Sequence, residues 1–178
     1  MAFRMLLGIL SGSIHCKQGV KACPLQDDEG SPANAFRSEM GNMPYSFEFD
    51  AVNRILRAAL EGRITDLEMR ALFRLLFWCV ATVKPSAGIV DTSGVLAFDV
   101  STTTIHYLAS CAPPFPPGVP RFIVAPATFM FGVARMFQGL VGDCCPDLRV
   151  VRSALQAYSE LGVAVVRFER LQLNYEVA

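Results

Sequence analysis

Residues 89–105 read IVDTSGVLAFDVSTTTI, and this stretch decides how the rest of the chain is interpreted. An apolar run stops at Asp91, restarts, and stops again at Asp99, after which four of five residues carry a hydroxyl group. The pattern predicts a short buried strand that ends at Asp91, then a loop, then a helix that begins near Ser101.

The hydroxyl cluster at the predicted helix start has two interpretations. The first backbone amides of a helix are unpaired and carry the positive end of its dipole, so a phosphate added to Ser101 would be stabilised there. The simpler interpretation is that Asp99, Ser101 or Thr102 only caps the helix, because these residue types are favoured caps.

The segment before this stretch predicts a β-hairpin and a helix. Residues 46–50 alternate apolar and polar side chains, and residues 52–62 follow after a turn, so two antiparallel strands are expected. Gly62 is expected to end the second strand. Thr65 and Glu68 have the spacing of a capping box, in which the two side chains satisfy free amides at a helix start.

Helices and strands alternate through the rest of the chain. Residues 163–168, which read VAVVRF, form either a further strand or a docked tail. This order is typical of an α/β fold with a mixed sheet opened by a hairpin and alternating helices packed on the sheet. Apolar spacing and turn residues predict helices at 66–83, 101–112, 128–141 and 153–163, and strands at 121–126 and 147–151.

The first 42 residues differ from the rest of the chain. Residues 1–16 contain a basic residue and a short apolar run, which resembles a signal peptide without a clean cleavage site. Residues 17–42 are polar with little periodicity. We therefore expect residues 1–42 to be a flexible arm or the result of a mis-assigned start at which Met43 is the true beginning, and residues 43–178 to form one domain.

Composition excludes several classes of protein. Hydrophobic residues make up 52% of the 178 residues and charged residues 18%, which excludes a disordered chain. Sixteen basic and 16 acidic residues balance, so no electrostatic case for nucleic-acid binding exists. After the N-terminus no apolar run reaches the roughly 18 residues that a membrane span needs. We expect a protein of the cytoplasm.

The six cysteines are sparse for a disulfide scaffold and are interpreted as reduced thiols. Cys16 and Cys23 have no matching downstream pair, so a zinc site is not expected. Cys144 and Cys145 lie in a predicted turn and are either a reactive pair or incidental thiols of a solvent-exposed loop.

The predicted order of elements, together with two short motifs, resembles the STAS domain of sulfate transporters and anti-sigma-factor antagonists. The strand end of the family motif is matched by Asp91, Ser93, Gly94 and Val95, and the helix start by Phe98, Asp99 and Ser101. Val100 and Thr102 stand where the family usually has a first serine and a glycine. A subgroup of small bacterial STAS-like proteins is also similar over residues 43–68 and 121–140, and the resemblance covers about residues 43–163.

The resemblance implies a non-enzymatic regulatory module that binds a protein partner, such as an anti-sigma-factor kinase. Ser101 is then the phosphorylation candidate, because in the family the second serine of the motif is phosphorylated by a partner kinase. A switch loop would contain Asp91, Ser93, Gly94, Asp99 and Thr102. The phosphate's charge would break or make the contact with the partner.

The apolar segment 128–141 offers further candidates for a binding site. Arg135 is the one cation in the apolar segment 128–141, and it either contacts an anionic ligand or lies at the solvent edge with its stem packed flat. The same segment carries more apolar bulk than one core-facing stripe requires. Alternatives to core filling are a pocket for a lipid or other hydrophobic molecule and a homodimer seam.

Little in the sequence points to catalysis. His106 has no orienting carboxylate or nucleophile elbow and is interpreted as structural. No phosphate-binding glycine loop is present, and the carboxylate pairs fit helix starts or an outer strand face. We expect no enzyme activity, no cofactor and no metal site.

Overall fold

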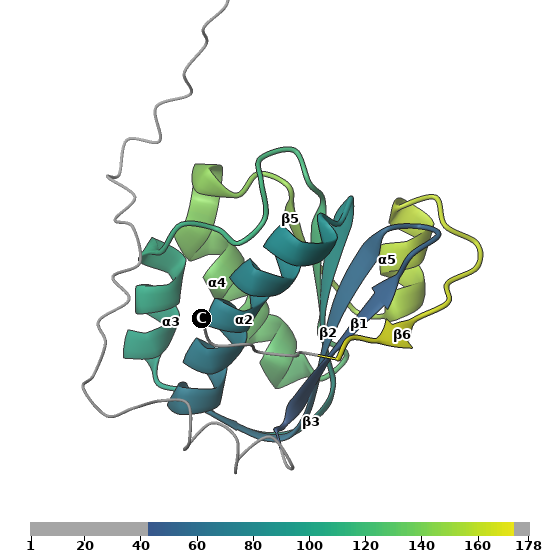
Figure 1. The fold of residues 1–178 in the computed structure, drawn as a ribbon. Helices are drawn as coiled ribbons and strands as arrows, with labels where there is room; N and C mark the ends of the chain where they lie inside the picture. Colours follow the sequence, from purple (N-terminus) through teal and green to yellow (C-terminus); the bar gives the residue numbers. More distant parts are fainter. Residues whose placement is uncertain (1–42, 173–178) are drawn as a thin grey trace, which may run out of the picture.

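The computed structural model describes residues 43–172, which form a mixed α/β fold with a six-stranded sheet (Figure 1). The predicted arm, residues 1–42, lies outside the described residues. None of the helices in the described part is both long and apolar enough to cross a membrane. The elements are β1 (Tyr45–Asp50), β2 (Ile55–Thr65), α2 (Asp66–Val83), β3 (Ala87–Asp99), α3 (Thr102–Ser110), β4 (Arg121–Val124), α4 (Thr128–Val141), the 3₁₀ turn η2 (Gly142–Cys144), β5 (Leu148–Val151), α5 (Ala154–Glu160) and β6 (Glu169–Arg170).

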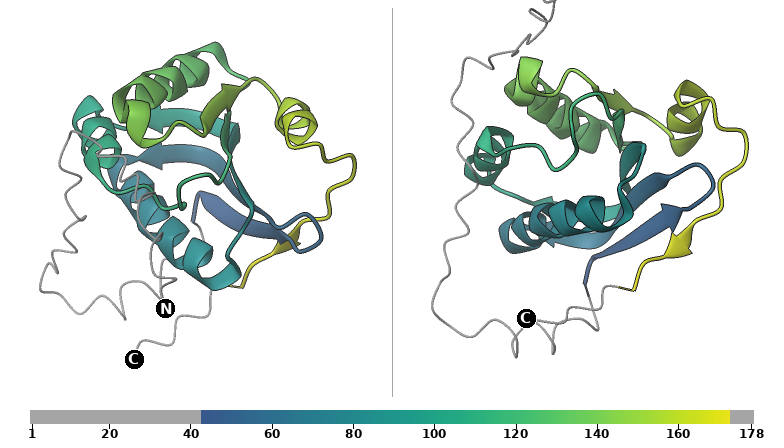
Figure 2. Two further views of the ribbon diagram at one scale, coloured as in Figure 1. Left: turned by 90° about the horizontal axis from the view of Figure 1, so that it is seen from above. Right: turned by 45° about the horizontal axis from the view of Figure 1, so that its top comes forward.

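The strand order β5-β4-β3-β2-β1-β6 explains where the helices lie. Strands β2 to β5 are parallel neighbours, and each crossover moves one strand in the same direction along the sheet. Since such crossovers are right-handed, their helices fall on one face. Helices α2, α3 and α4 accordingly cover one face, and α5 lies on the other (Figures 1 and 2).

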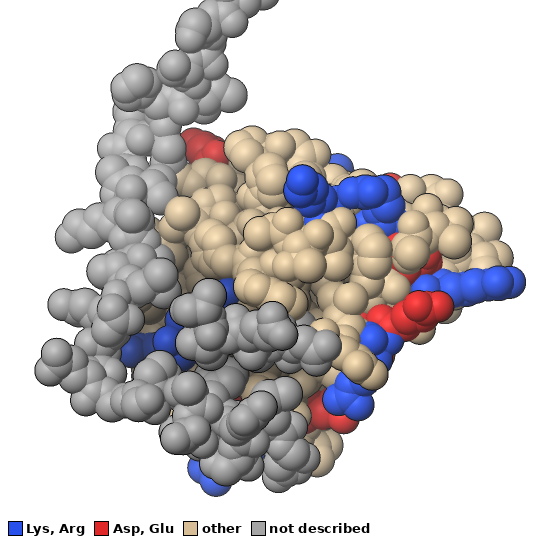
Figure 3. Space-filling model, viewed as in Figure 1, with Lys and Arg blue, Asp and Glu red and all other residues tan. Residues whose placement is uncertain are grey.

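The predicted hairpin is confirmed, because β1 and β2 pair antiparallel from Tyr45↔Leu60 to Asp50↔Ile55. Asp50 shapes the turn, since its carboxylate accepts the backbone N–H groups of Val52 and Asn53 at 2.9 and 3.0 Å. On the face shown in Figure 3, charged side chains of both signs gather side by side toward the edge where β1 and β6 lie.

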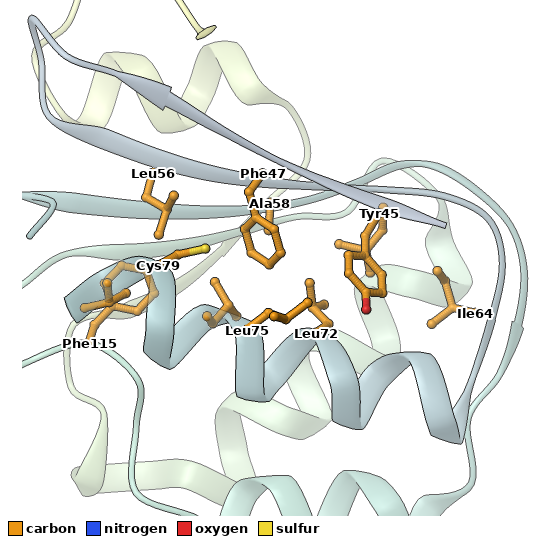
Figure 4. Close-up of a cluster of buried hydrophobic side chains, with 12 residues drawn as sticks. Tyr45, Phe47, Leu56, Ala58, Ile64, Leu72, Leu75, Cys79 and Phe115 are labelled. Carbon is orange, nitrogen blue, oxygen red and sulfur yellow. The ribbon is translucent and has the colours of Figure 1, made fainter. Parts of the chain in front are cut away.

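Helix α2 has the predicted bounds and start. The backbone N–H of Thr65 donates to the Glu68 carboxylate at 2.8 Å, as a capping box requires. The helix ends at Val83, and the capping residue Lys84, whose φ of 47° is left-handed, stands just before Pro85. Figure 4 shows its apolar face packed on β1 and β2, the main core of the domain. The buried residues of α2 are Leu72, Leu75, Leu76, Cys79 and Val80.

The predicted strand end at Asp91, the loop after it and the predicted break at Gly62 are wrong. Strand β3 runs for 13 residues to Asp99, because β2 continues through Gly62 and pairs with it as far as Thr65↔Asp99. Gly62, with φ of 70°, lies at a register shift in the ladder and bends the strand without ending it. The polar residues that follow Asp91 have the local pattern of a loop, but pairing with β2 holds them in an extended strand.

The remaining elements follow the prediction closely. Helices α3, α4 and α5 and strands β4 and β5 lie within the predicted ranges, and Ser153 caps α5 by accepting the Gln156 N–H. Residues 163–168 have no regular structure and are a docked tail. Val163, Val166 and Phe168 pack against the core on the α5 face, and β6 then pairs with β1 at Glu48↔Arg170.

Candidate functional site

The corner at Ser101 joins the starts of two helices. Ser101 is exposed and caps α3, since its Oγ accepts the Thr104 N–H at 3.2 Å. The backbone N–H and the hydroxyl of Ser101 both donate to Oδ1 of Asp66, the first residue of α2, at 2.8 and 3.1 Å. The prediction that Ser101 lies at an accessible helix start is confirmed.

The charges around this corner are nearly all paired. The hydrogen bond from the Ser101 backbone N–H lowers the pKa of the Asp66 carboxyl more than any other contact. Desolvation raises this pKa by less, so it lies below its ordinary value. Asp99, at the end of β3, forms an ion pair with Arg63 of β2 at 2.5 Å. Arg70 donates to the Thr104 hydroxyl at 3.1 Å and stacks over the ring of Tyr107. A phosphate on Ser101 would therefore meet a carboxylate first.

The predicted switch loop does not exist as one cluster. Asp91 lies eight residues before Asp99 on the same strand, which places the two about 26 Å apart at roughly 3.3 Å per residue. Asp91 accepts the N–H and the hydroxyl of Ser93 at 2.9 and 2.5 Å. Of the residues predicted to form the loop, Asp99 and Thr102 lie near Ser101. Asp91, Ser93 and Gly94 do not, because β3 is extended between them.

Asp91 belongs to an ion cluster beneath α5. Arg57 of β2 pairs with Asp91 at 2.7 Å and with Glu48 at 3.2 Å, and its guanidinium lies over the ring of Phe168. Burial lowers the pKa of Arg57, but the bond and charge of Asp91 and the charge of Glu48 raise it by more. Burial also raises the pKa of the Tyr158 hydroxyl. The cluster holds the C-terminal segment on the sheet.

Substituting Ser101 by alanine is expected to lower the free energy of unfolding by about 1 kcal/mol, the usual cost of losing a helix cap. Urea unfolding followed by circular dichroism measures the change. Thr103→Ala is the matched control, because Thr103 is exposed in the first turn of α3, and an effect within about 0.5 kcal/mol is expected there. Equal effects of both substitutions would contradict the capping role.

Arg135 lies on the solvent-exposed side of α4. Its side chain is exposed on α4 and donates to Oε1 of Gln138 at 2.6 Å. This is the solvent-edge alternative of the sequence analysis. His106 is exposed as well, on α3.

A cavity of about 170 Å³ lies between the sheet and helices α2, α3 and α4. Its walls are almost wholly apolar, and the excess bulk of α4 contributes much of them, while Phe129 and Met136 of the same helix are exposed. The outer end of the Phe115 ring lies against Gly88, where a Cβ atom would come within 2.3 Å of it. Helix α4 contributes Met130, Val133, Ala134, Phe137 and Val141, and the other walls include Met69, Phe73, Val90, Phe98, Ile105, Leu108, Phe115 and Leu148.

Arg121 is the one charged residue among those that line the cavity. It begins β4, is only 7% exposed, and donates from Nη1 to the Cys145 sulfur at 3.4 Å. Its Nε is buried without a hydrogen-bond partner. Sequence reasoning missed Arg121, since an arginine at the start of a short strand has no local signal that separates it from a solvated one.

The thiols of the described residues are mostly inert. Cys79, Cys111 and Cys145 are buried, and Cys79 and Cys145 are free thiols. Burial raises the pKa of Cys79 to about 12, which removes it as a nucleophile at neutral pH. Cys144 is disulfide-bonded, which corrects the prediction of reduced thiols for that residue. Cys16 and Cys23 lie outside the described residues.

Between residues 43 and 172, no group of three or more His, Cys, Asp or Glu side chains is placed to hold a metal ion. The arrangement offers two features with chemical consequences, an apolar cavity beside a buried cation and an exposed serine at a helix start. Comparison with known proteins finds no matching family model and no matching curated protein.

Proposed function

We propose that this protein is a binding module for a small apolar ligand, held in the cavity between the sheet and helices α2, α3 and α4. The observation that carries the proposal is the cavity itself, about 170 Å³ with apolar walls inside the main layer of the fold. Protein interiors are close-packed, and voids larger than a water molecule are few. The cavity is partly open, and a ligand that fills it would remove its apolar walls from water, which is favourable.

The size and walls define the ligand's body. An apolar cavity of about 150 Å³ stays dry and binds benzene, so a body of about six to ten carbons is appropriate here. Met69 and Met130 line the cavity, and the flexible methionine side chain adapts to ligands of somewhat different shape. A long-chain lipid does not fit this volume without rearrangement of the walls.

Thermal unfolding of the full chain with added 1-octanol or toluene tests the proposal. A ligand at about 100 times its Kd is expected to raise Tm by about 5 to 10 °C. Native mass spectrometry of the purified protein is the second measurement, and a bound apolar molecule that leaves on denaturation supports the proposal. A protein that is empty and also shows no Tm change with either probe would contradict it.

We also propose a second function, regulation of a protein partner of the anti-sigma-factor type by phosphorylation of Ser101 in the bacterial cytoplasm. The observation that favours it is the pair of hydrogen bonds from Ser101 to Asp66, which join the starts of α2 and α3. A phosphate carries a charge of about −1.5 to −2 and would repel the Asp66 carboxylate. The corner would then open and change the surface that a partner contacts.

Two variants of Ser101 test the switch. Asparagine preserves the cap without a charge, and aspartate preserves the cap and adds one. In a pull-down from native cytoplasm, Ser101→Asn is expected to retain a histidine-kinase-like ATPase that wild type also retains, and Ser101→Asp is expected to lose it. Retention by both variants, or absence of this ATPase with wild type, would contradict the switch.

A further inference from the structure

We infer that Arg121 makes the cavity selective for a carboxylate with an apolar body of about six to ten carbons, such as a medium-chain fatty acid. The inference rests on the proposed function, because it specifies the ligand of the same cavity. Arginine stays protonated in proteins, so the wall of the cavity holds one fixed positive charge, which lies just beneath an apolar inner surface.

Arg121 has no ionic partner within the described part of the chain. The ion pairs found between residues 43 and 172 join Arg57, Arg63 and Arg149 to carboxylates, and none includes Arg121. Its one hydrogen bond goes to a thiol, which is a weak acceptor, and Nε has none. Buried charges are normally paired, because an uncompensated one is costly. An anionic group on a ligand would supply the ionic partner that Arg121 lacks among the described residues.

The surroundings favour a carboxylate over a phosphate. A carboxylate carries a single charge and matches the planar guanidinium fork. A phosphate monoester has a charge close to −2 and needs further donors. The lining offers no second cation, and the hydroxyl of Thr92 already donates to the Val124 carbonyl at 2.8 Å. Arg121 can therefore neutralise a head group with a single negative charge, such as a carboxylate.

The position of Arg121 also orients the ligand. Through Cys145 it lies beside the C-terminal end of α4, because Cys145 packs with Val141. The lining part of α4 from Met130 to Val141 spans about 16 Å at 1.5 Å per residue. An extended eight-carbon acid with its head at Arg121 thus directs its tail along α4 toward Met130.

Isothermal titration of the full chain with octanoate, 1-octanol and octyl phosphate tests the inference. For wild type, octanoate is expected to bind most tightly of the three. Arg121→Met replaces the unbranched stem of arginine with a similar apolar one and removes the charged group. It is expected to weaken octanoate binding about 10- to 100-fold and to change 1-octanol binding less than about threefold. Arg135→Gln is the matched control, since Arg135 is exposed on α4, and no change is expected.

The outcomes separate this inference from the proposed function. Binding of 1-octanol with no preference for octanoate, or with no effect of Arg121→Met, overturns the role of Arg121 and leaves the cavity as a site. Binding of none of the ligands overturns both. Without ligand, Arg121→Met is expected to be at least as stable as wild type, because it removes an unpaired buried charge. A variant that fails to fold or melts much earlier would show that Arg121 has an internal partner, and would contradict the inference.

Discussion

Replacing Asp50 with alanine is expected to lower the free energy of unfolding by about 2 to 4 kcal/mol, because buried donors lose their acceptor. Asp50 is fully buried, and besides the two turn amides it accepts the Asn53 side-chain amide at 2.7 Å and the Arg167 N–H at 2.9 Å. One carboxylate therefore fixes the hairpin turn and fastens the C-terminal segment 117 positions away to it. Loss of the segment would uncover the apolar side chains beneath it.

The pH dependence follows from the same contacts. Burial raises the pKa of Asp50, but the hydrogen bonds from Asn53, Arg167 and Val52 lower it by more, so it lies below the ordinary value of 3.8. A carboxyl with a lowered folded-state pKa contributes stability above its unfolded pKa, and this contribution is lost as the pH falls through the folded value. The difference between wild type and Asp50→Ala is therefore expected to be full at pH 7 and to shrink below about pH 3.8.

Urea unfolding at pH 7 and pH 3, followed by circular dichroism, measures both effects. Asp143→Ala is the matched control, because Asp143 is an exposed carboxylate in η2, and a change within about 0.5 kcal/mol is expected. A loss below about 1 kcal/mol for Asp50→Ala, or a difference that grows as the pH falls, would contradict the role assigned to Asp50.

Replacing Val133 with tryptophan is expected to abolish ligand binding, with a loss of affinity greater than about 100-fold. Val133 lines the cavity from α4, and an indole ring would occupy much of its 170 Å³. Because the ring fills existing space, the free energy of unfolding is expected to stay close to that of wild type. Overpacking of an already filled core would instead cost about 1 to 3 kcal/mol. Titration with octanoate and 1-octanol, together with thermal unfolding, measures the two quantities.

Two further variants make this result interpretable. Met136→Trp places the same ring on the exposed side of α4, where Met136 is 38% exposed, and is expected to leave binding unchanged. Ala134→Leu adds a smaller group at a buried wall of the cavity and is expected to weaken binding. It serves as the test if the tryptophan variant does not fold. Wild-type affinity in a folded Val133→Trp protein would show that the ligand binds elsewhere.

The elements that sequence reasoning found are those that local signals determine. The Asp50 turn, the Thr65 and Glu68 capping box, and the Ser101 cap are each made by residues within a few positions of one another. The length of β3 is not local, because its second half is extended only through pairing with β2. Asp91 was consequently expected in a loop near Ser101 and lies instead in the ion cluster beneath α5.

The candidate site was only partly accessible to sequence reasoning for the same reason. The surplus of apolar side chains on residues 128–141 indicated a pocket as one alternative, but the cavity is formed by three helices and a sheet together. Arg135 and Arg121 look alike in sequence, as single cations next to apolar runs. The sheet decides between them, since it turns Arg121 toward the covered face while α4 presents Arg135 to solvent.

The most direct measurement of the central claim, that the cavity holds an apolar ligand, is a crystal structure of the full chain with 8-bromooctanoate. The bromine marks the end of the ligand's tail by its anomalous scattering. The proposed function predicts a bromine peak between the sheet and α4, and the inferred role of Arg121 places that peak close to Met130 and Ala134, with the carboxylate beside Arg121. A peak on the outer surface, with the cavity walls unchanged and the cavity empty, would contradict it.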